Sequence, residues 1–152
     1  MSIHGDRAYA AFMQGFNCAQ SVAVAFAPEL GMSEEQVLRL ASGFGAGVGR
    51  LREVCGAFGG VVLVLGALYG NTDPAGKTAT YARVQELAHR FQSAHGSYLC
   101  RDLLAGVETT PGGAPEARTA QYYAKRPCAG LCESAAALFD AYVQENPPEK
   151  QP

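Results

Sequence analysis

The chain has 152 residues, 48% of them hydrophobic and 17% charged, with a formal net charge of −2 at pH 7. These values are typical of one soluble domain with a sizeable core, and they argue against nucleic-acid binding through bulk charge. The first residues lack the basic region and apolar core of a secretory signal, so we expect a cytoplasmic protein with no membrane insertion.

Capping signals and apolar spacing predict helices along almost the whole chain. Asp6 and Asn17 are suitable N-caps, and Pro28 is expected to end the second helix. Ser33 should form a capping box with Gln36. No segment alternates with period two, so the sequence predicts an all-α, single-domain bundle of about six to eight helices. The expected helices span residues 6–14, 18–26, 34–42, 54–69 and 77–95, a short segment that holds Cys100, and 127–144.

The connections also carry information about the domain. A glycine-rich connection at 43–50 leads into the apolar segment 54–69, whose 16 residues are fewer than the roughly 20 that cross a bilayer. Residues 106–117 have no periodicity and are expected to form a mobile loop. We therefore expect one helical domain over 1–145 and a flexible C-terminal tail over 146–152.

Cysteine placement is the strongest chemical signal in the sequence. The five cysteines are Cys18, Cys55, Cys100, Cys128 and Cys132. Four of them lie at or near expected helix starts, and Cys132 follows one helical turn after Cys128. Free amides and the helix dipole at such positions favour a thiolate, which is both a nucleophile and a metal ligand. A small buried hydrophobe is the ordinary alternative for a single free cysteine, but packing alone does not explain the repeated placement.

Cys55 is the expected attacking thiolate among these residues. Arg50 and Arg52 precede it closely, and Gly56 and Gly60 leave room for a partner to approach. Burial among apolar neighbours would oppose this effect, because desolvation penalises a thiolate. Ala57 and Asn17, the latter as the cap of the Cys18 helix, are expected to support the site.

Cysteine spacing leaves two chemical uses open. The gaps contain 36, 44, 27 and 3 residues, which fits neither a zinc ribbon nor a ferredoxin pattern. The first use is dithiol–disulfide exchange or electron transfer with an unidentified redox partner, which requires no cofactor. The second is an iron–sulfur cluster or zinc site with four thiolate ligands. That ligand set would be Cys18, Cys55, Cys100 and Cys128, with Cys132 as an accessory thiol.

Glycine spacing supports a third, non-catalytic interpretation. Gly56 and Gly60 form a GxxxG face, as do Gly66 and Gly70. Such faces permit close helix packing, either against the Cys18 helix or across a homodimer. The chain would then be a helical oligomerisation module.

The segment Cys55-Gly56-Ala57-Phe58-Gly59-Gly60, with single cysteines far upstream and downstream, resembles the C-GCAxxG-C-C family of redox-active proteins. The segments at 17–20, 41–50 and 100–104 are also similar to that family. The resemblance implies that the family cysteines are Cys18, Cys55, Cys100 and Cys128, and that an enzymatic role would be thiol–disulfide oxidoreduction. Val54 precedes Cys55, so the Cys-Gly-Ala form is met and the literal Gly-Cys-Ala order is not.

Overall fold

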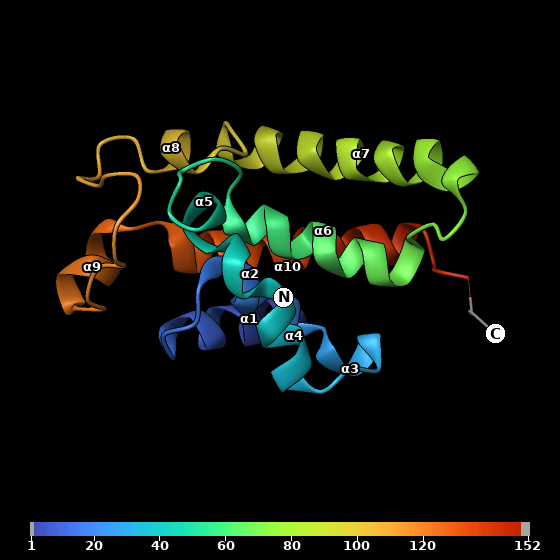
Figure 1. The fold of residues 1–152 in the computed structure, drawn as a ribbon, viewed down its shortest axis with the longest axis horizontal. Coiled ribbons are helices and arrows are strands. Elements are labelled where there is room, and N and C mark those ends of the chain that lie inside the picture. Colours follow the sequence, from blue (N-terminus) through green and yellow to red (C-terminus); the bar gives the residue numbers. More distant parts are fainter. Residues whose placement is uncertain (1, 150–152) are drawn as a thin grey trace.

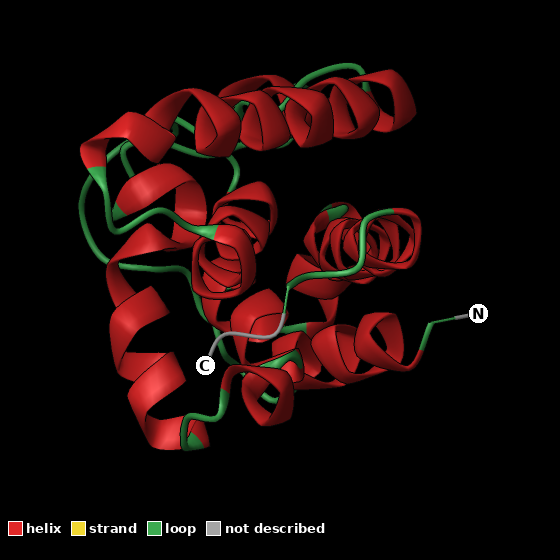
Figure 2. Cartoon of the chain, turned by 90° about the vertical axis from the view of Figure 1, so that its right-hand side faces the viewer, coloured by secondary structure: helices red, strands yellow, loops and turns green. Residues whose placement is uncertain are grey.

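The computed structural model describes residues 2–149, and this part of the chain is all-helical (Figures 1 and 2). The only β-type contact within it is an isolated antiparallel bridge between Val54 and Leu99. The expected all-α fold is therefore confirmed. The longer helices are α1 (Ile3–Met13), α2 (Cys18–Ala25), α4 (Glu34–Ala41), α6 (Gly56–Tyr69), α7 (Lys77–His95) and α10 (Cys128–Glu145). The short ones are α3 (Ala27–Leu30), η1 (Ser42–Phe44), α5 (Gly45–Val48), η2 (Pro74–Gly76), α8 (Cys100–Leu103) and α9 (Ala120–Lys125).

Local capping explains several helix boundaries. Asn17 and Ser33 each accept a hydrogen bond from the amide three residues on, and both form complete capping boxes. Gly96 ends α7 in the left-handed conformation, with φ of 88°. These boundaries follow the sequence prediction because caps act over a few neighbouring residues.

Other boundaries correct the sequence prediction. Ser2, not Asp6, caps the first helix, and its hydroxyl accepts from the amide of Gly5. Pro28 lies in the first turn of α3, where proline is tolerated, so it starts a short helix after α2. The sequence prediction also missed α9, whose cap is Thr119.

The helices pack around α2, α6 and α10. Helix α1 contacts α2 and α10, while α6 contacts α2, α7 and α10. In Figure 1, α7 forms the upper edge of the molecule. Helix α10 ends at Glu145; the predicted tail starts at the next residue, and its positions 150–152 lie outside the described residues. The largest fully buried hydrophobic side chains of the core are Phe12, Val22, Phe26, Val64, Leu65, Phe91, Phe139 and Tyr142.

The length and hydropathy of each helix show whether it could span a membrane. None of the helices found in residues 2–149 has both the length and the apolar character that crossing a bilayer requires.

Candidate thiol site

Four helix N-termini meet at one small cavity. Cys18, Cys100 and Cys128 are the first residues of α2, α8 and α10, and Cys55 is the N-cap of α6. All four line a cavity of about 30 Å³, together with Arg52, Tyr122, Arg126 and several apolar side chains. The structure thus brings together four thiols that are far apart in the sequence.

Cys132 lies behind this cavity. Cys132 is fully buried, and its thiol donates a hydrogen bond to the carbonyl oxygen of Cys18 over 3.7 Å. The thiol of Cys18 lies against those of Cys128 and Cys132. All five cysteines are free thiols, and Cys18 is the one that is not fully buried.

Glycines allow the helices to approach closely enough for this convergence. A Cβ atom on Gly56 would lie 2.9 Å from the Cβ of Cys18, and one on Gly60 would lie 2.9 Å from the carbonyl oxygen of Ala19. The first GxxxG face therefore packs against the Cys18 helix within one chain. A Cβ on Gly66 would meet nothing within 4 Å. The second GxxxG face, formed by Gly66 and Gly70, is therefore not packed at Gly66, and its use in a homodimer stays a prediction.

The glycine-rich connection turns left-handed beside the thiols. Five consecutive residues, from Ala46 to Arg50, have φ between 54° and 72°, and Arg52 has φ of 59°. Non-glycine residues pay roughly 1–2 kcal/mol each for this conformation. A Cβ on Gly47 would lie 2.6 Å from the Cα of Arg52 and 2.7 Å from the Cβ of Cys100. The connection therefore requires glycine at this position.

The left-handed turn directs Arg52 to Cys100. Its Nη1 donates to the Sγ of Cys100 over 3.7 Å, and its Nη2 donates to the hydroxyl of Thr109 over 2.6 Å. Arg50 points elsewhere: its Nε donates to the carbonyl oxygen of Gly112 over 2.9 Å. Arg52 lines the same cavity as Cys55 and Arg50 does not, and neither donates a hydrogen bond to the Cys55 sulfur in the described residues. Support of Cys55 by these arginines therefore stays a prediction.

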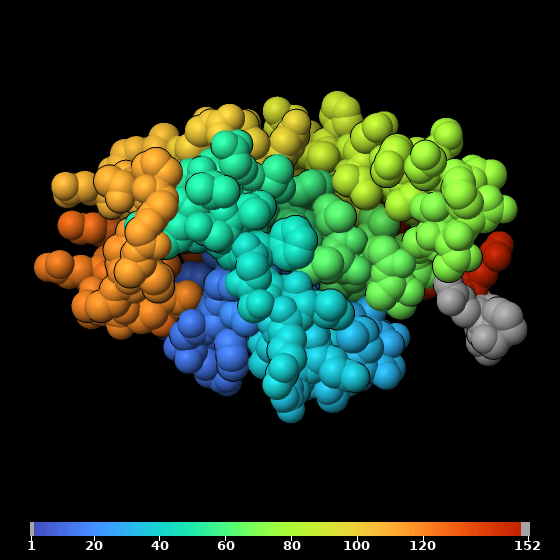
Figure 3. Space-filling view, viewed as in Figure 1, coloured from blue at the N-terminus to red at the C-terminus, as the bar shows by residue number. Residues whose placement is uncertain are grey.

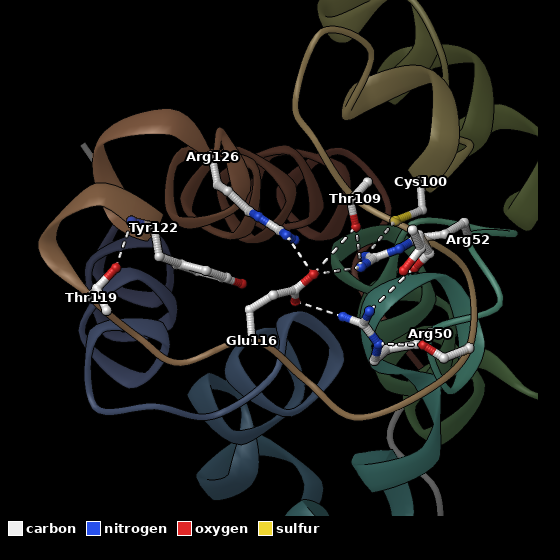
Figure 4. Close-up of polar contacts among 10 residues, drawn as sticks. Arg50, Arg52, Cys100, Thr109, Glu116, Thr119, Tyr122 and Arg126 are labelled. Atoms are coloured by element: carbon white, nitrogen blue, oxygen red, sulfur yellow. Dashed lines mark hydrogen bonds and ion pairs between the residues drawn. The ribbon is translucent and has the colours of Figure 1, made fainter.

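Three arginines share one carboxylate next to the cavity (Figure 4). Glu116 pairs with Arg50 at 2.6 Å, with Arg126 at 3.0 Å and with Arg52 at 3.6 Å. The three guanidinium groups are at most 10% exposed, so the cluster carries two uncompensated positive charges near the thiols. Burial would raise the pKa of Glu116, but its own amide, Arg50 and Arg126 hold that pKa at about 2.

Residues 106–119, which we call the strap, run from α8 to α9 across this cluster. Figure 3 shows the orange strap lying against the teal segment around residue 50. The amide of Gly112 donates to the carbonyl oxygen of Arg50 over 2.7 Å. Arg118 donates to the carbonyl oxygens of Phe12 and Phe16, both over 2.8 Å. The strap contains no helix, as predicted for residues 106–117, but hydrogen bonds from Gly112 and Arg118 tie its middle and its end to the helical part of the protein.

Burial raises the pKa of the thiols. It raises the pKa of Cys55 to about 12, although the amides of Phe58 and Ala57 oppose the change. Burial also raises the pKa of Cys100, while the hydrogen bond from Arg52 lowers it. The hydrogen bond with Cys128 lowers the pKa of Cys18, whereas the contact with Cys132 and burial raise it. Together the raising effects are the larger, so the pKa of Cys18 lies well above its usual value. The Cys18 contact and burial both raise the pKa of Cys128.

The arrangement of the four thiols bears on the expected metal site. Within residues 2–149, no group of three or more histidine, cysteine, aspartate or glutamate side chains is arranged to hold a metal ion. The four thiols therefore share a cavity without the tetrahedral arrangement that zinc requires.

Sequence reasoning missed three residues of the site. Thr109 and Glu116 lie in the strap, where no periodic signal distinguishes one polar residue from another. Arg126 directly precedes the Pro127-Cys128 helix start, so its closeness to that cysteine was the one usable signal.

The fold and the site define an all-helical protein with clustered thiols. The chain belongs to the C_GCAxxG_C_C family, whose description is "Putative redox-active protein (C_GCAxxG_C_C)" and whose sequence model matches residues 16–142. No curated protein and no solved structure matches the chain.

Proposed function

We propose that this protein cycles between a dithiol and an intramolecular disulfide, with Cys18 and Cys128 as the disulfide-forming pair. The observation that carries the proposal is the convergence of four helix-start cysteines on one cavity of about 30 Å³. Thiols held this close exchange with one another more readily than with solutes, because the second step is intramolecular.

Exposure selects the residue that first meets a partner. Cys18 is half-buried, whereas Cys55, Cys100, Cys128 and Cys132 are buried. The Cys18 thiolate attacks one sulfur of a partner disulfide, so a mixed disulfide forms and the partner's other sulfur leaves as a thiol. Cys128 then attacks the Cys18 sulfur and releases the second partner thiol. Two electrons pass from the protein to the partner, and the reverse sequence reduces the protein.

This assignment gives the first attack to Cys18 instead of Cys55. The pKa is raised for both thiols, so acidity does not separate them. The choice rests on exposure, because Cys18 is half-buried and Cys55 is buried. Cys55 remains on the cavity wall as a thiol that can exchange with the others.

The test is a thiol count on reduced protein prepared without oxygen. Five free thiols should be titratable, and excess cystamine should lower the count by two with no bound cysteamine. Cys18→Ser, which lacks the first attacking thiol, should remain unoxidised. Cys128→Ser, which lacks the second, should retain a mixed disulfide. Cys132→Ala is the matched control and should still lose two thiols. An unchanged count in the unmodified protein would contradict the proposal.

A further inference from the structure

Arg52 donates a hydrogen bond to one thiol of the cluster, that of Cys100. It is 5% exposed, lines the cavity and donates to the Cys100 sulfur, while Thr109 fixes its other terminal nitrogen. Its buried Nε finds no hydrogen-bond acceptor anywhere in residues 2–149. A buried N–H group without an acceptor is costly, so the cavity suits a small ligand that can accept a hydrogen bond.

Cavity size limits what this ligand can be. A water molecule requires roughly 10–15 Å³ by the same kind of measure, so about 30 Å³ accommodates about two oxygen-sized atoms. A disulfide-containing peptide is far larger. Tyr122 and Arg126 line both this cavity and an outer groove of about 630 Å³.

The charge around the cavity matches an oxidation that produces an anion. Arg52 and Arg126 both line the cavity, and the one carboxylate beside them is already shared with Arg50. Two net positive charges stabilise a thiolate before the reaction and an oxyanion leaving group during it. Cys100 is the thiol that Arg52 contacts directly.

We propose that hydrogen peroxide is the oxidant that this cavity admits and that Cys100 is the thiol it oxidises; the inference rests on the redox function proposed above. The Cys100 thiolate attacks one peroxide oxygen. A sulfur–oxygen bond forms, the oxygen–oxygen bond breaks, and hydroxide leaves and takes up the proton that the thiol released. The sulfur loses two electrons and the peroxide gains two.

A neighbouring thiol then completes the reaction. Cys128 attacks the Cys100 sulfenic acid, a disulfide forms and water leaves. Cys18, which lies against Cys128, attacks the Cys128 sulfur, and Cys100 leaves as a thiol. The product is the Cys18–Cys128 disulfide that a dithiol partner reduces. Peroxide therefore enters at the buried end of the cluster and the reductant at the half-buried end.

The experiment treats reduced protein, at one mildly alkaline pH, with an equimolar amount of hydrogen peroxide in the presence of dimedone. In Cys128→Ser, dimedone should be found on Cys100 by peptide mass spectrometry, ahead of the other three cysteines. Arg52→Gln should slow this labelling by about tenfold or more, the order expected for loss of a charged hydrogen bond. Arg52→Lys should recover part of the rate. Arg101→Gln, which removes an exposed neighbouring arginine, should leave it unchanged.

Thr109→Val keeps the inference testable if the arginine variants do not fold. It removes the hydroxyl that fixes Arg52 in nearly the same volume, and a severalfold slower labelling of Cys100 is expected. Labelling spread evenly over the cysteines, or first on Cys18, would overturn the inference. If cystamine still removes two thiols in that case, the proposed function stands and the peroxide assignment alone fails.

Discussion

The guanidinium of Arg52 donates a hydrogen bond to the thiol of Cys100 across 3.7 Å, although the two residues are 48 positions apart in the chain. The contact depends on the left-handed backbone at Arg52, where φ is 59°. It joins the glycine-rich connection to the start of α8 and brings a buried positive charge to the thiol cavity. Backbone conformation and thiol chemistry are therefore linked at this point.

Gly47→Ala should destabilise the protein by at least about 2 kcal/mol, because it adds left-handed strain and a clash. The new Cβ would lie 2.7 Å from the Cβ of Cys100, at a position with φ of 72°. Chemical denaturation of the reduced protein measures the change. Gly43→Ala is the matched control, since its Cβ would meet nothing within 4 Å, and its effect should stay within about 0.5 kcal/mol. Equal effects of the two substitutions would contradict this description of the connection.

Glu116→Gln should loosen the strap without unfolding the core, because three arginines lose their shared carboxylate. Hydrogen exchange at the amide of Gly112 should accelerate roughly tenfold, the order for one charged hydrogen bond. The reference is Glu108→Gln, an exposed glutamate of the same strap, which should not change the exchange. Equal exchange in both variants would mean that Glu116 does not hold the strap.

Acid should loosen the same contacts. The pKa of Glu116 is lowered to about 2 from an ordinary 4.5, so its stabilising contribution is complete above pH 4.5. This contribution is lost as the pH falls through about 2. The hydrogen-exchange rates of the strap in the unmodified protein and in Glu116→Gln should therefore converge at low pH. A difference that persists below pH 2 would show that another group is responsible.

Cys55 should be slow to alkylate. Its pKa is raised from 9.0 to about 12, so its thiolate fraction, and hence its rate, should keep rising up to about pH 12. The raised pKa also makes the folded state lose stability above pH 9, where the unfolded chain ionises first, by up to about 1.4 kcal/mol per pH unit. Site-resolved mass spectrometry and denaturation at two alkaline pH values measure both effects. A Cys55 rate that levels off near pH 9 would contradict the burial argument.

Local sequence signals predicted much of the fold, but they could not predict contacts between residues far apart in the chain. Asn17 and Ser33 cap helices because the cap bonds involve residues only three positions away. The same signals placed the cysteines at helix starts, which explains why four of them were selected together. The hydrogen-bond partners of Arg50 and Arg52 were beyond such signals, because the left-handed backbone at these residues, with φ of 66° and 59°, aims the side chains at Gly112 and Cys100, which are 62 and 48 positions away.

The strap shows a second physical reason for failure. Its contacts with Arg50 and Arg52 join positions about 60 residues apart. Arg50 donates to the carbonyl oxygens of Thr110 and Gly112, which every residue type carries, and Arg52 donates to the Thr109 hydroxyl. No periodicity or composition distinguishes Glu116 from other glutamates before the fold brings the arginines to it.

The most direct test of the thiol cycle is the mapping of disulfides at the midpoint of a redox titration. Peptide mass spectrometry under non-reducing conditions identifies which cysteines are joined. The structure predicts an intramolecular bond from Cys128 to Cys18, with a bond from Cys128 to Cys100 as the earlier species after peroxide. Bonds that form only between molecules, or thiols that stay reduced throughout the titration, would contradict the central claim.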